Sequence, residues 1–507
     1  MKNQVKAGAI LTLVSLFIGN VISLGYTPFM LKSLGQIEYG LYGLANSIVG
    51  YLTVLDFGFG NAAVRYTAKY KAENCEYKLK YMYGMFISIY VIIGLVTFIL
   101  GLIISQNAGV FFTKGLTTNE IEIVRKLLIL ASINLAVSFP LGVFTAIITA
   151  YERFIFLKIT LIVRYLINPL VLIPVLLLGY KSIGLICATT VLNIIFLLGN
   201  LLYCLRKLKV RIAFRKFDFN LLKELFSYSL WIFVGSIVNQ LWWNSGQFML
   251  GIYSSAVSIA LYNLAMQFKS YFETFATSVS GVFLPRLTSM ESQKLSNEVF
   301  TDSFIKVGRL QFILISLITT GFILFGKQFI CIWAGEDYEL AYYITLIIFI
   351  PLSLVDTQTL GIAILQAKNK HKFRSIVYLC VVIVCITFCI PLIKKFDVFG
   401  CAIATASALT VGNIFIMNWY YHKRIGLNVF RFWREIIKIF PGVLVSAFTG
   451  YFCLVFMPPL HTYKLLLPSI LCYVFIFFTV LYFLSMNKYE RGLVMGVFAK
   501  IKKGMKK

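Results

Sequence analysis

The residues with the clearest chemical potential are charged or polar side chains inside long apolar segments. Arg164 and Asn168 lie four residues apart in the segment FLKITLIVRYLINPLVL, which places both on one face of a helix. A charge at the bilayer centre costs about 2.5–3.5 kcal/mol on insertion scales, so it usually faces a partner or a cavity. Either another helix supplies a carboxylate to Arg164, or the guanidinium faces water and an anionic ligand, and its planar fork suits phosphate.

Five charged positions form a second group: Lys269 is a further candidate for substrate binding, and the other four are candidates for coupling or gating. Lys269 and Glu273 are one turn apart, so they either neutralise each other within the helix or serve the transported substrate and its coupling. Asp356 either takes up a proton and couples transport to a gradient, or forms an ion pair with Arg164 or Lys269. Asp56 and Arg65 lie nearer the predicted cytoplasmic end of their helix and are further gating candidates.

Amide and aromatic side chains form a third group on one helical face. Gln240, Trp243, Asn244 and Gln247 are spaced three, one and three residues apart. Amides can bind sugar hydroxyls and an indole can cover the apolar face of a sugar ring, so the stripe predicts an oligosaccharide contact. The alternative is hydrogen bonding between helices. Asn20 aligns with Gln240 in a repeat described below and would line the same space.

The elements that position these residues are predicted to be membrane-spanning helices. Of the 507 residues, 59% are hydrophobic and only 13% are charged, which is too little polar surface for a water-soluble globule of this length. Apolar runs of about 20 residues, enough to cross the hydrocarbon core, number fourteen. They lie near 10–30, 38–57, 82–105, 127–149, 154–178, 182–205, 226–250, 254–284, 304–326, 339–366, 373–393, 398–421, 436–457 and 464–486. The predicted fold class is an all-α integral membrane protein.

The formal net charge of +27 tracks the sides of the membrane and not a nucleic-acid surface. With the N-terminus inside, 35 of the 47 Lys and Arg residues fall on the inner side of the predicted spans. The positive-inside rule therefore places both termini in the cytoplasm. No nucleic-acid partner is expected, whereas anionic membrane lipid is an expected partner of the basic segments.

The chain is internally duplicated. Leu41, Tyr42, Leu44 and Ala45 recur as Leu261, Tyr262, Leu264 and Ala265, an offset of 220. Further matches at offsets of 216–217 join the later helices of the two halves, so the spans divide as six, six and two. Two similar bundles around a central site are the usual architecture of transporters. Charged residues are not repeated, because Lys269 and Glu273 correspond to Val49 and Thr53.

This pattern predicts five parts. They are an N-terminal six-helix bundle (1–206), an amphipathic cytoplasmic linker (207–225), a C-terminal six-helix bundle (226–421), two additional spans (422–487) and a basic cytoplasmic tail (488–507). The linker either lies on the membrane surface or is a solvated loop whose charges set the topology.

Neither a metal site nor a catalytic centre is expected. Seven of the ten cysteines lie within predicted spans, no CxxC pair occurs in their closest cluster, and the three histidines are in separate loops. No outer loop exceeds roughly 20 residues, which leaves no extramembrane domain for catalysis. The protein is therefore predicted not to be an enzyme, and to need no cofactor beyond a proton or sodium gradient.

The segment around the second predicted span resembles the polysaccharide transporters, which flip lipid-linked oligosaccharides in bacteria. The residues concerned are Leu41-Tyr42-Gly43-Leu44-Ala45, Leu55-Asp56-Phe57-Gly58-Phe59-Gly60 and Arg65-Tyr66. These transporters share a superfamily with multidrug (MATE) exporters and the lipid II flippase. The resemblance extends over the whole chain through its spans, duplication and linker.

The resemblance implies a flippase of the bacterial cytoplasmic membrane. It would move an undecaprenyl-pyrophosphate-linked repeat unit outward by alternating access, for the synthesis of O-antigen, capsule or exopolysaccharide. A polysaccharide polymerase and chain-length machinery are partners that this role allows. Relatives use arginines on the first helix for pyrophosphate, but this chain has only Asn20 and Thr27 there, so Arg164 and Lys269 are the inferred replacements.

The sequence is also compatible with two other functions. A cation-coupled MATE-type exporter would favour acidic sites over the mixed charges found here. A membrane-embedded polymerase or glycosyltransferase would need a convergent set of acids, bases or metal ligands, which the sequence does not display.

Overall fold

The computed structural model of the protein is helical, and no strand occurs among the residues that it describes. These are residues 2–214, 219–280, 283–368, 370, 372–458, 460 and 462–495. Ten described segments are long and apolar enough to cross a bilayer, or up to eleven if one bent helix pair counts as a crossing. The predicted all-α membrane fold is therefore confirmed, whereas the number of fourteen crossings stays a prediction.

Two of the ten segments are far longer than one crossing requires. Val14–Ala72 and Phe373–Ile425 contain 59 and 53 residues, whereas about 20 suffice for the hydrocarbon core. Each has a residue with a non-helical backbone inside a long helix, Gly35 (φ 73°) in the first and Asp397 (φ 51°) in the second. The sequence predicts a boundary between two spans at each of these places.

The two non-helical residues tolerate a positive φ for different reasons. Gly35 has no side chain to oppose a positive φ. Asp397 adopts the same unusual region while its carboxylate accepts hydrogen bonds from Ser254 and, at 2.8 Å, from Ser258. These bonds fix the backbone that a non-glycine residue adopts at a cost.

The described chain divides into two compact units, and all three boundaries fall inside helices, one in α9 and two in α14. Unit 1 comprises Met1–Asn263 and Ile386–Cys401, and unit 2 comprises Leu264–Cys385 and Ala402–Lys507. Unit 1 contains α1 (Lys2–Leu52), the 3₁₀ turn η1 (Thr53–Asp56), α2 (Phe59–Ala72), α3 (Glu76–Gln106), α4 (Ala108–Phe112), α5 (Thr118–Ala150), α6 (Phe154–Leu177), α7 (Lys181–Arg206), α8 (Phe219–Tyr253) and the start of α9 (Ala256–Ser280).

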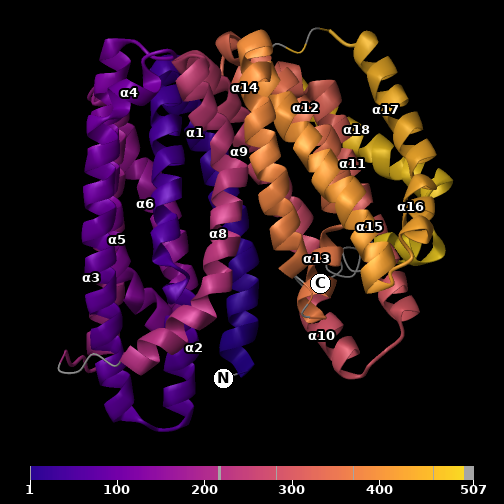
Figure 1. Ribbon diagram of the computed structural model, residues 1–507. Helices are drawn as coiled ribbons and strands as arrows, with labels where there is room; N and C mark the ends of the chain where they lie inside the picture. The colour runs from indigo at the N-terminus through magenta and orange to yellow at the C-terminus, as the bar shows by residue number, and fades with distance from the viewer. Residues whose placement is uncertain are drawn as a thin grey trace, which may run out of the picture. The chain divides into compact units, whose positions relative to one another are not determined.

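Small residues set the packing in unit 1. Figure 1 shows α3 and α5 side by side, and Gly94 of α3 has no room for a Cβ atom beside the Ala136 backbone of α5. Such small positions let membrane helices approach closely. The start of α5 is fixed by a capping box, in which Thr117 and Glu120 bond each other's backbone N–H groups.

The duplicated segment packs on its own copy. A Cβ atom at Gly40 would meet the backbone of Ala256 and lie 3.2 Å from the Ala260 nitrogen, and one at Gly43 would lie 2.7 Å from Nδ2 of Asn263. Gly40 and Ala260, like Gly43 and Asn263, are counterparts at the offset of 220. Each residue thus contacts its own counterpart, as a two-fold arrangement of these two segments requires.

Unit 2 is built around the long helix α11. It contains the rest of α9, α10 (Leu284–Ser292), α11 (Asn297–Trp333), η3 (Glu336–Tyr338), α12 (Leu340–Thr357), α13 (Thr359–Ala367), most of α14 (Lys372–Leu409), the π-helical segments η4 (Thr410–Met417) and η5 (Tyr421–Ile425), α15 (Asn418–Tyr420), α16 (Val429–Ile437), α17 (Phe440–Val455) and α18 (Tyr463–Leu484). Phe304 of α11 stacks on Phe432 of α16, with ring centroids 4.1 Å apart, and both rings are fully buried.

Candidate functional site

Helices α1 and α6 run parallel and in register within unit 1. A Cβ atom at Gly8 would lie 2.8 Å from Cβ of Phe154, and one at Gly19 would lie 2.8 Å from Cε2 of Tyr165. Both contacts join residues whose numbers differ by 146. Residues separated by this offset therefore lie at the same level along the two helices.

This register gathers Asn20, Arg164 and Asn168. By the offset, Arg164 and Asn168 are level with positions 18 and 22 of α1, so the three residues lie within about one helical turn. Successive residues of a helix are rotated by about 100° around its axis. Asn20 is one residue after Gly19, whereas Arg164 and Asn168 are one residue before and three residues after Tyr165. In two parallel helices that face each other, these rotations turn all three side chains toward the same side of the contact. Three predicted substrate-binding residues from two helices thus lie on one stripe.

The three side chains of this stripe are half-buried and have their polar atoms available. In the described part of the chain, none of Asn20, Arg164 and Asn168 forms a side-chain hydrogen bond or ion pair. The alternative of an intramembrane carboxylate partner for Arg164 is therefore not realised among the described residues. A guanidinium with five N–H donors and two amides remain for a ligand.

The predicted amide stripe of α8 is used differently. Gln240 Nε2 donates to Thr53 Oγ1 at 3.2 Å, and Thr53 in turn donates to the Gly50 carbonyl at 2.6 Å. Asn244 Nδ2 donates to Gln240 Oε1. This chain of bonds joins α8 to the end of α1, and its members polarise one another.

The remaining members of the stripe also contact neighbouring residues. Gln247 is buried and its Nε2 donates to Asn263 Oδ1 of α9 at 2.9 Å. Trp243 is half-buried, with its ring edge-on to Trp242 at 6.3 Å between centroids. The amides of Gln240 and Gln247 hence bond residues outside α8, which is the alternative that the sequence left open, whereas Asn244 bonds Gln240 within α8.

Unit 2 holds a buried cluster of one cation and two carboxylates. Lys269 Nζ lies 2.7 Å from Glu273 Oε2, with only 7% of Lys269 exposed. Asp356, 5% exposed, interacts electrostatically with both of them. One carboxylate is therefore in excess of the cation, which is the composition that a transported proton or metal cation would neutralise.

A break in the helix positions Asp356. Helix α12 ends at Thr357, Gln358 adopts φ −107° and ψ 20°, and α13 begins at Thr359. The Oδ2 atom of Asp356 is buried without a hydrogen-bond donor among the described residues. Discontinuous helices with a polar group at the break are typical of the ion and substrate sites of transporters.

Asp56 ends η1 just before the turn to α2, and Arg65 lies within α2. Asp56 Oδ1 accepts a hydrogen bond from the Tyr90 hydroxyl at 2.6 Å, which ties the turn to α3. Gly58 follows with φ 75°, a value that favours glycine and explains this residue in the motif. Arg65 is exposed, with its guanidinium 5.9 Å from the Tyr66 ring centroid.

Two polar clusters were not predicted from the sequence. Asn193 of α7 donates to Asn134 Oδ1 at 2.8 Å and to Ser138 Oγ at 2.7 Å of α5. Asn200, seven residues later on the same face of α7, donates to Thr145 of α5. This spacing of two helical turns is the sequence signal that could have revealed the cluster. The second cluster joins Arg309 to Glu490. The two residues are 181 positions apart, so no helical spacing in the sequence relates them. No group of three or more potential metal ligands occurs within the described ranges.

Sequence comparison gives the chain relatives in polysaccharide synthesis. A family model described as "Polysaccharide biosynthesis protein" matches residues 5–291. A Shigella flexneri protein with the provisional name O-antigen transporter is 20% identical over 420 residues, covering 80% of this chain and 95% of the relative. The uncharacterized membrane protein EpsK of Bacillus subtilis (strain 168) is 23% identical over 523 residues, covering 99% of each chain.

Structural comparison identifies the fold. The lipid II flippase MurJ, in an inward closed conformation, superposes with a TM-score of 0.75 at 18% identity, covering 93% of this chain and 98% of MurJ. An inward-facing multidrug resistance MATE family transporter of the MOP superfamily gives a TM-score of 0.60 at 14% identity, covering 84% and 99%. The predicted resemblance is confirmed: the family model spans more than half of the chain, and the protein belongs to the polysaccharide biosynthesis protein family, with the helical fold of MurJ and the MATE transporters.

Proposed function

We propose that this protein is a flippase for undecaprenyl-pyrophosphate-linked oligosaccharide repeat units in the bacterial cytoplasmic membrane. It would move them from the cytoplasmic to the outer leaflet by alternating access, without catalysing a reaction. The observation that carries the proposal is the polar stripe of Asn20, Arg164 and Asn168, whose side chains are without partners among the described residues. Family membership supports the role in polysaccharide synthesis.

The chemistry of the stripe fits the phosphate end of such a lipid. A half-buried guanidinium can donate two parallel hydrogen bonds to phosphate oxygens, and these bonds are stronger where water is scarce. The neighbouring amides of Asn20 and Asn168 can donate to the bridging oxygens or to the first sugar. Because the amides of α8 bond other residues of unit 1, sugar contact by Gln240, Asn244 and Gln247 would require those bonds to exchange.

The proposed orientation follows from the distribution of basic residues. With 35 of 47 Lys and Arg on one side of the predicted spans, both termini would be cytoplasmic. The fourteen spans, the linker 207–225 and the basic tail 488–507 form part of this proposal. Anionic lipid would hold the basic segments, and a polymerase with its chain-length machinery would receive the flipped unit.

Deleting the gene in its bacterial host should trap lipid-linked repeat units on the cytoplasmic leaflet, because the hydrocarbon core is a high barrier to a polar sugar. The measurement is the accessibility of the lipid-linked pool to a membrane-impermeant glycosidase, in right-side-out vesicles and after permeabilisation. Normal surface glycan with an accessible pool would disprove the proposal. Drug hypersensitivity with unchanged glycan would favour a MATE-type exporter instead.

We also propose that the cluster of Lys269, Glu273 and Asp356 couples transport to a proton or sodium gradient. The cluster has one more carboxylate than cations, and Asp356 lies beside the break in the helix. A proton or sodium ion that binds there would neutralise the extra negative charge. When the bound proton or sodium ion leaves, Asp356 is a buried anion, and Lys269 is the cation that interacts with it. Movement of Lys269 between the two carboxylates then offers a two-state element.

Asp356→Asn should uncouple transport, because the amide keeps the shape of the side chain but cannot bind a proton or balance a cation. In proteoliposomes, the flipping rate of the variant is expected to be unchanged when a proton or sodium gradient is imposed, whereas the unmodified protein responds. Asp302→Asn, at an exposed carboxylate of α11, is the control and should respond normally. Full gradient dependence of Asp356→Asn would remove this residue from coupling.

A further inference from the structure

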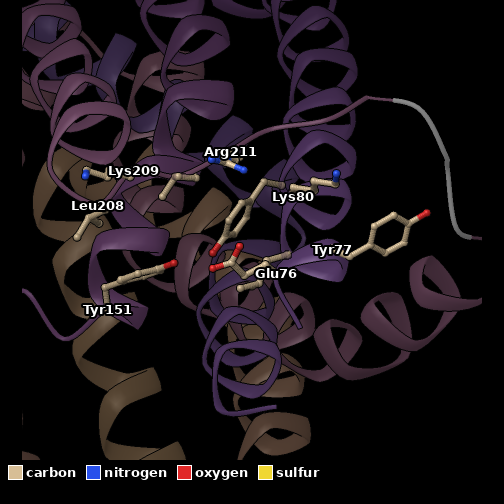
Figure 2. A pocket seen from close by; sticks show the side chains of 10 residues that line it. Glu76, Tyr77, Lys80, Tyr151, Leu208, Lys209 and Arg211 are labelled. Atoms are coloured by element: carbon tan, nitrogen blue, oxygen red, sulfur yellow. The ribbon is translucent and has the colours of Figure 1, made fainter. Parts of the chain in front are cut away.

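A cavity of about 450 Å³ opens where the chain leaves α7 and passes the start of α3. We call it the linker pocket. Its wall includes Lys80 of α3, Tyr151 after α5, and Lys209 and Arg211 of the segment that follows α7 (Figure 2). The volume lies within the range of about 300–1,000 Å³ that is usual for small-ligand sites.

Backbone bonds fix the linker side of this pocket. The Val210 nitrogen donates to the Cys204 carbonyl at 3.1 Å, and the Ala213 nitrogen donates to the Lys80 carbonyl at 3.0 Å. The Ala213 backbone also contacts Gly84 of α3, where a Cβ atom would have no room. The segment is therefore held to α7 at one end and to α3 at the other, which fixes the wall of the pocket.

Side chains alternate along this held segment. Val210 is buried and belongs to the core of unit 1, and Ile212 packs against the same core. Lys209, whose backbone has φ 52°, and Arg211 flank Val210 and are exposed at the pocket wall. The apolar residues thus anchor the segment to the core, and two basic residues line the pocket.

The charges of the pocket are unbalanced. None of Lys80, Lys209 and Arg211 forms an ion pair or a side-chain hydrogen bond in the described part of the chain. Lys80 lies 5.3 Å from the ring centroid of Tyr77, a cation–π contact that leaves its charge in place. Glu76 is the single carboxylate of the wall, so two positive charges are in excess.

Two tyrosines add hydroxyl groups to this wall. Tyr83 and Tyr151 both line the pocket; the Tyr83 hydroxyl is buried behind the wall, whereas Figure 2 shows the Tyr151 hydroxyl turned toward the pocket. Phenolic hydroxyls donate to phosphate oxygens, and Arg211 offers the bidentate fork that phosphate prefers. Cations, hydroxyl donors and one enclosing wall together favour a phosphate group over a carboxylate or a sugar.

We propose that the linker pocket binds a phosphate-bearing anion, distinct from the substrate at the Arg164 stripe. The apolar run of α3 begins two residues after Lys80, at the predicted membrane boundary, so the phosphate of an anionic phospholipid headgroup is within reach. A soluble phosphate compound shares the same chemistry. Either ligand would bridge α3 and the linker and strengthen the attachment of the linker to unit 1.

Binding can be measured without transport, on the full-length protein in a neutral detergent. The probes are dihexanoyl-phosphatidylglycerol, dihexanoyl-phosphatidylcholine and inorganic phosphate, each titrated and followed by native mass spectrometry. The double substitution Lys209→Gln/Arg211→Gln should weaken binding of the anionic lipid about tenfold or more, because two charge-assisted contacts are lost. Lys423→Gln/Arg424→Gln removes the same charge at exposed positions of unit 2 and should not weaken it.

A variant that is expected to bind more tightly distinguishes a specific loss of binding from misfolding. Glu76→Gln removes the carboxylate that repels phosphate and should tighten binding of the anionic lipid several-fold. Loss of phosphatidylglycerol binding alone in the double variant identifies a lipid, and a matching loss for inorganic phosphate identifies a soluble ligand. Equal affinities of the pocket variants and the control for both probes would overturn the proposal, while leaving the proposed flippase untouched.

Discussion

Arg164→Ala is expected to abolish flipping while leaving the amount of folded protein unchanged. The side chain forms no hydrogen bond or ion pair with any described residue, so its removal costs the fold little. It is nevertheless the cation of the α1–α6 stripe, and the phosphate that it would hold has no equivalent donor there. Two charge-assisted bonds lost from a water-poor site reduce binding by about a hundredfold or more. The measurement is the flipping rate of the purified lipid-linked repeat unit in proteoliposomes.

Two further substitutions define what the arginine contributes. Arg164→Lys keeps the positive charge but not the planar guanidinium. If the lysine variant partly restores the flipping rate relative to Arg164→Ala, the charge alone contributes to transport. If it restores the rate poorly, bidentate hydrogen bonding is required. Lys158→Ala, on the same helix one and a half turns earlier, is the matched control and should flip at the normal rate. Unchanged transport by Arg164→Ala would leave this arginine with a structural role only.

Much of the architecture could be predicted because it depends on local patterns. Gly35 and Asp397 lie where the sequence places boundaries between apolar runs, and both have non-helical backbones. The Lys269–Glu273 pair was visible from its four-residue spacing and is present at 2.7 Å. Each of these features is determined by residues within one or two helical turns of one another.

The break at Gln358 and the register of α1 with α6 could not be predicted in the same way. No proline or glycine marks the break, and Asp356 gains its position from contacts of α12 and α13 with other helices. The register depends on Gly8 and Gly19 admitting the rings of Phe154 and Tyr165, which are more than 140 residues away. Sequence spacing carries no information about such pairs.

The amides of α8 show why residue type alone did not separate two functions. Their shared face was predicted, and both sugar binding and interhelical bonding use the same donors. What distinguishes the two is the neighbouring helix: Thr53 and Asn263 lie within 3.2 and 2.9 Å of Gln240 and Gln247. With those partners in place, Arg164 and its amide neighbours become the better candidates for the ligand.

Arg309→Ala is expected to cause the largest loss of stability. Arg309 and Glu490 are 4% and 3% exposed, and the guanidinium bonds both carboxylate oxygens at 2.6 and 2.9 Å. It also donates to the carbonyls of Glu435 and Ser485, so one side chain ties α11 to α16 and to the segment after α18. Removing it leaves a buried carboxylate without its cation, which typically costs about 3–5 kcal/mol. The measurement is the free energy of unfolding in mixed detergent micelles.

Two comparisons isolate the buried charge as the cause. Arg431→Ala breaks an exposed pair with Asp302, 2.9 Å long, and should cost less than about 1 kcal/mol because water solvates both charges. Arg309→Met with Glu490→Met removes both buried charges together and should cost far less than Arg309→Ala, since no unpaired carboxylate remains. If the double substitution were as damaging as the single one, the carbonyl bonds to α16 and to Ser485, and not the ion pair, would be the source of the stability. A loss for Arg309→Ala no greater than that for Arg431→Ala would show that the Arg309 bonds do not hold this end of unit 2 together.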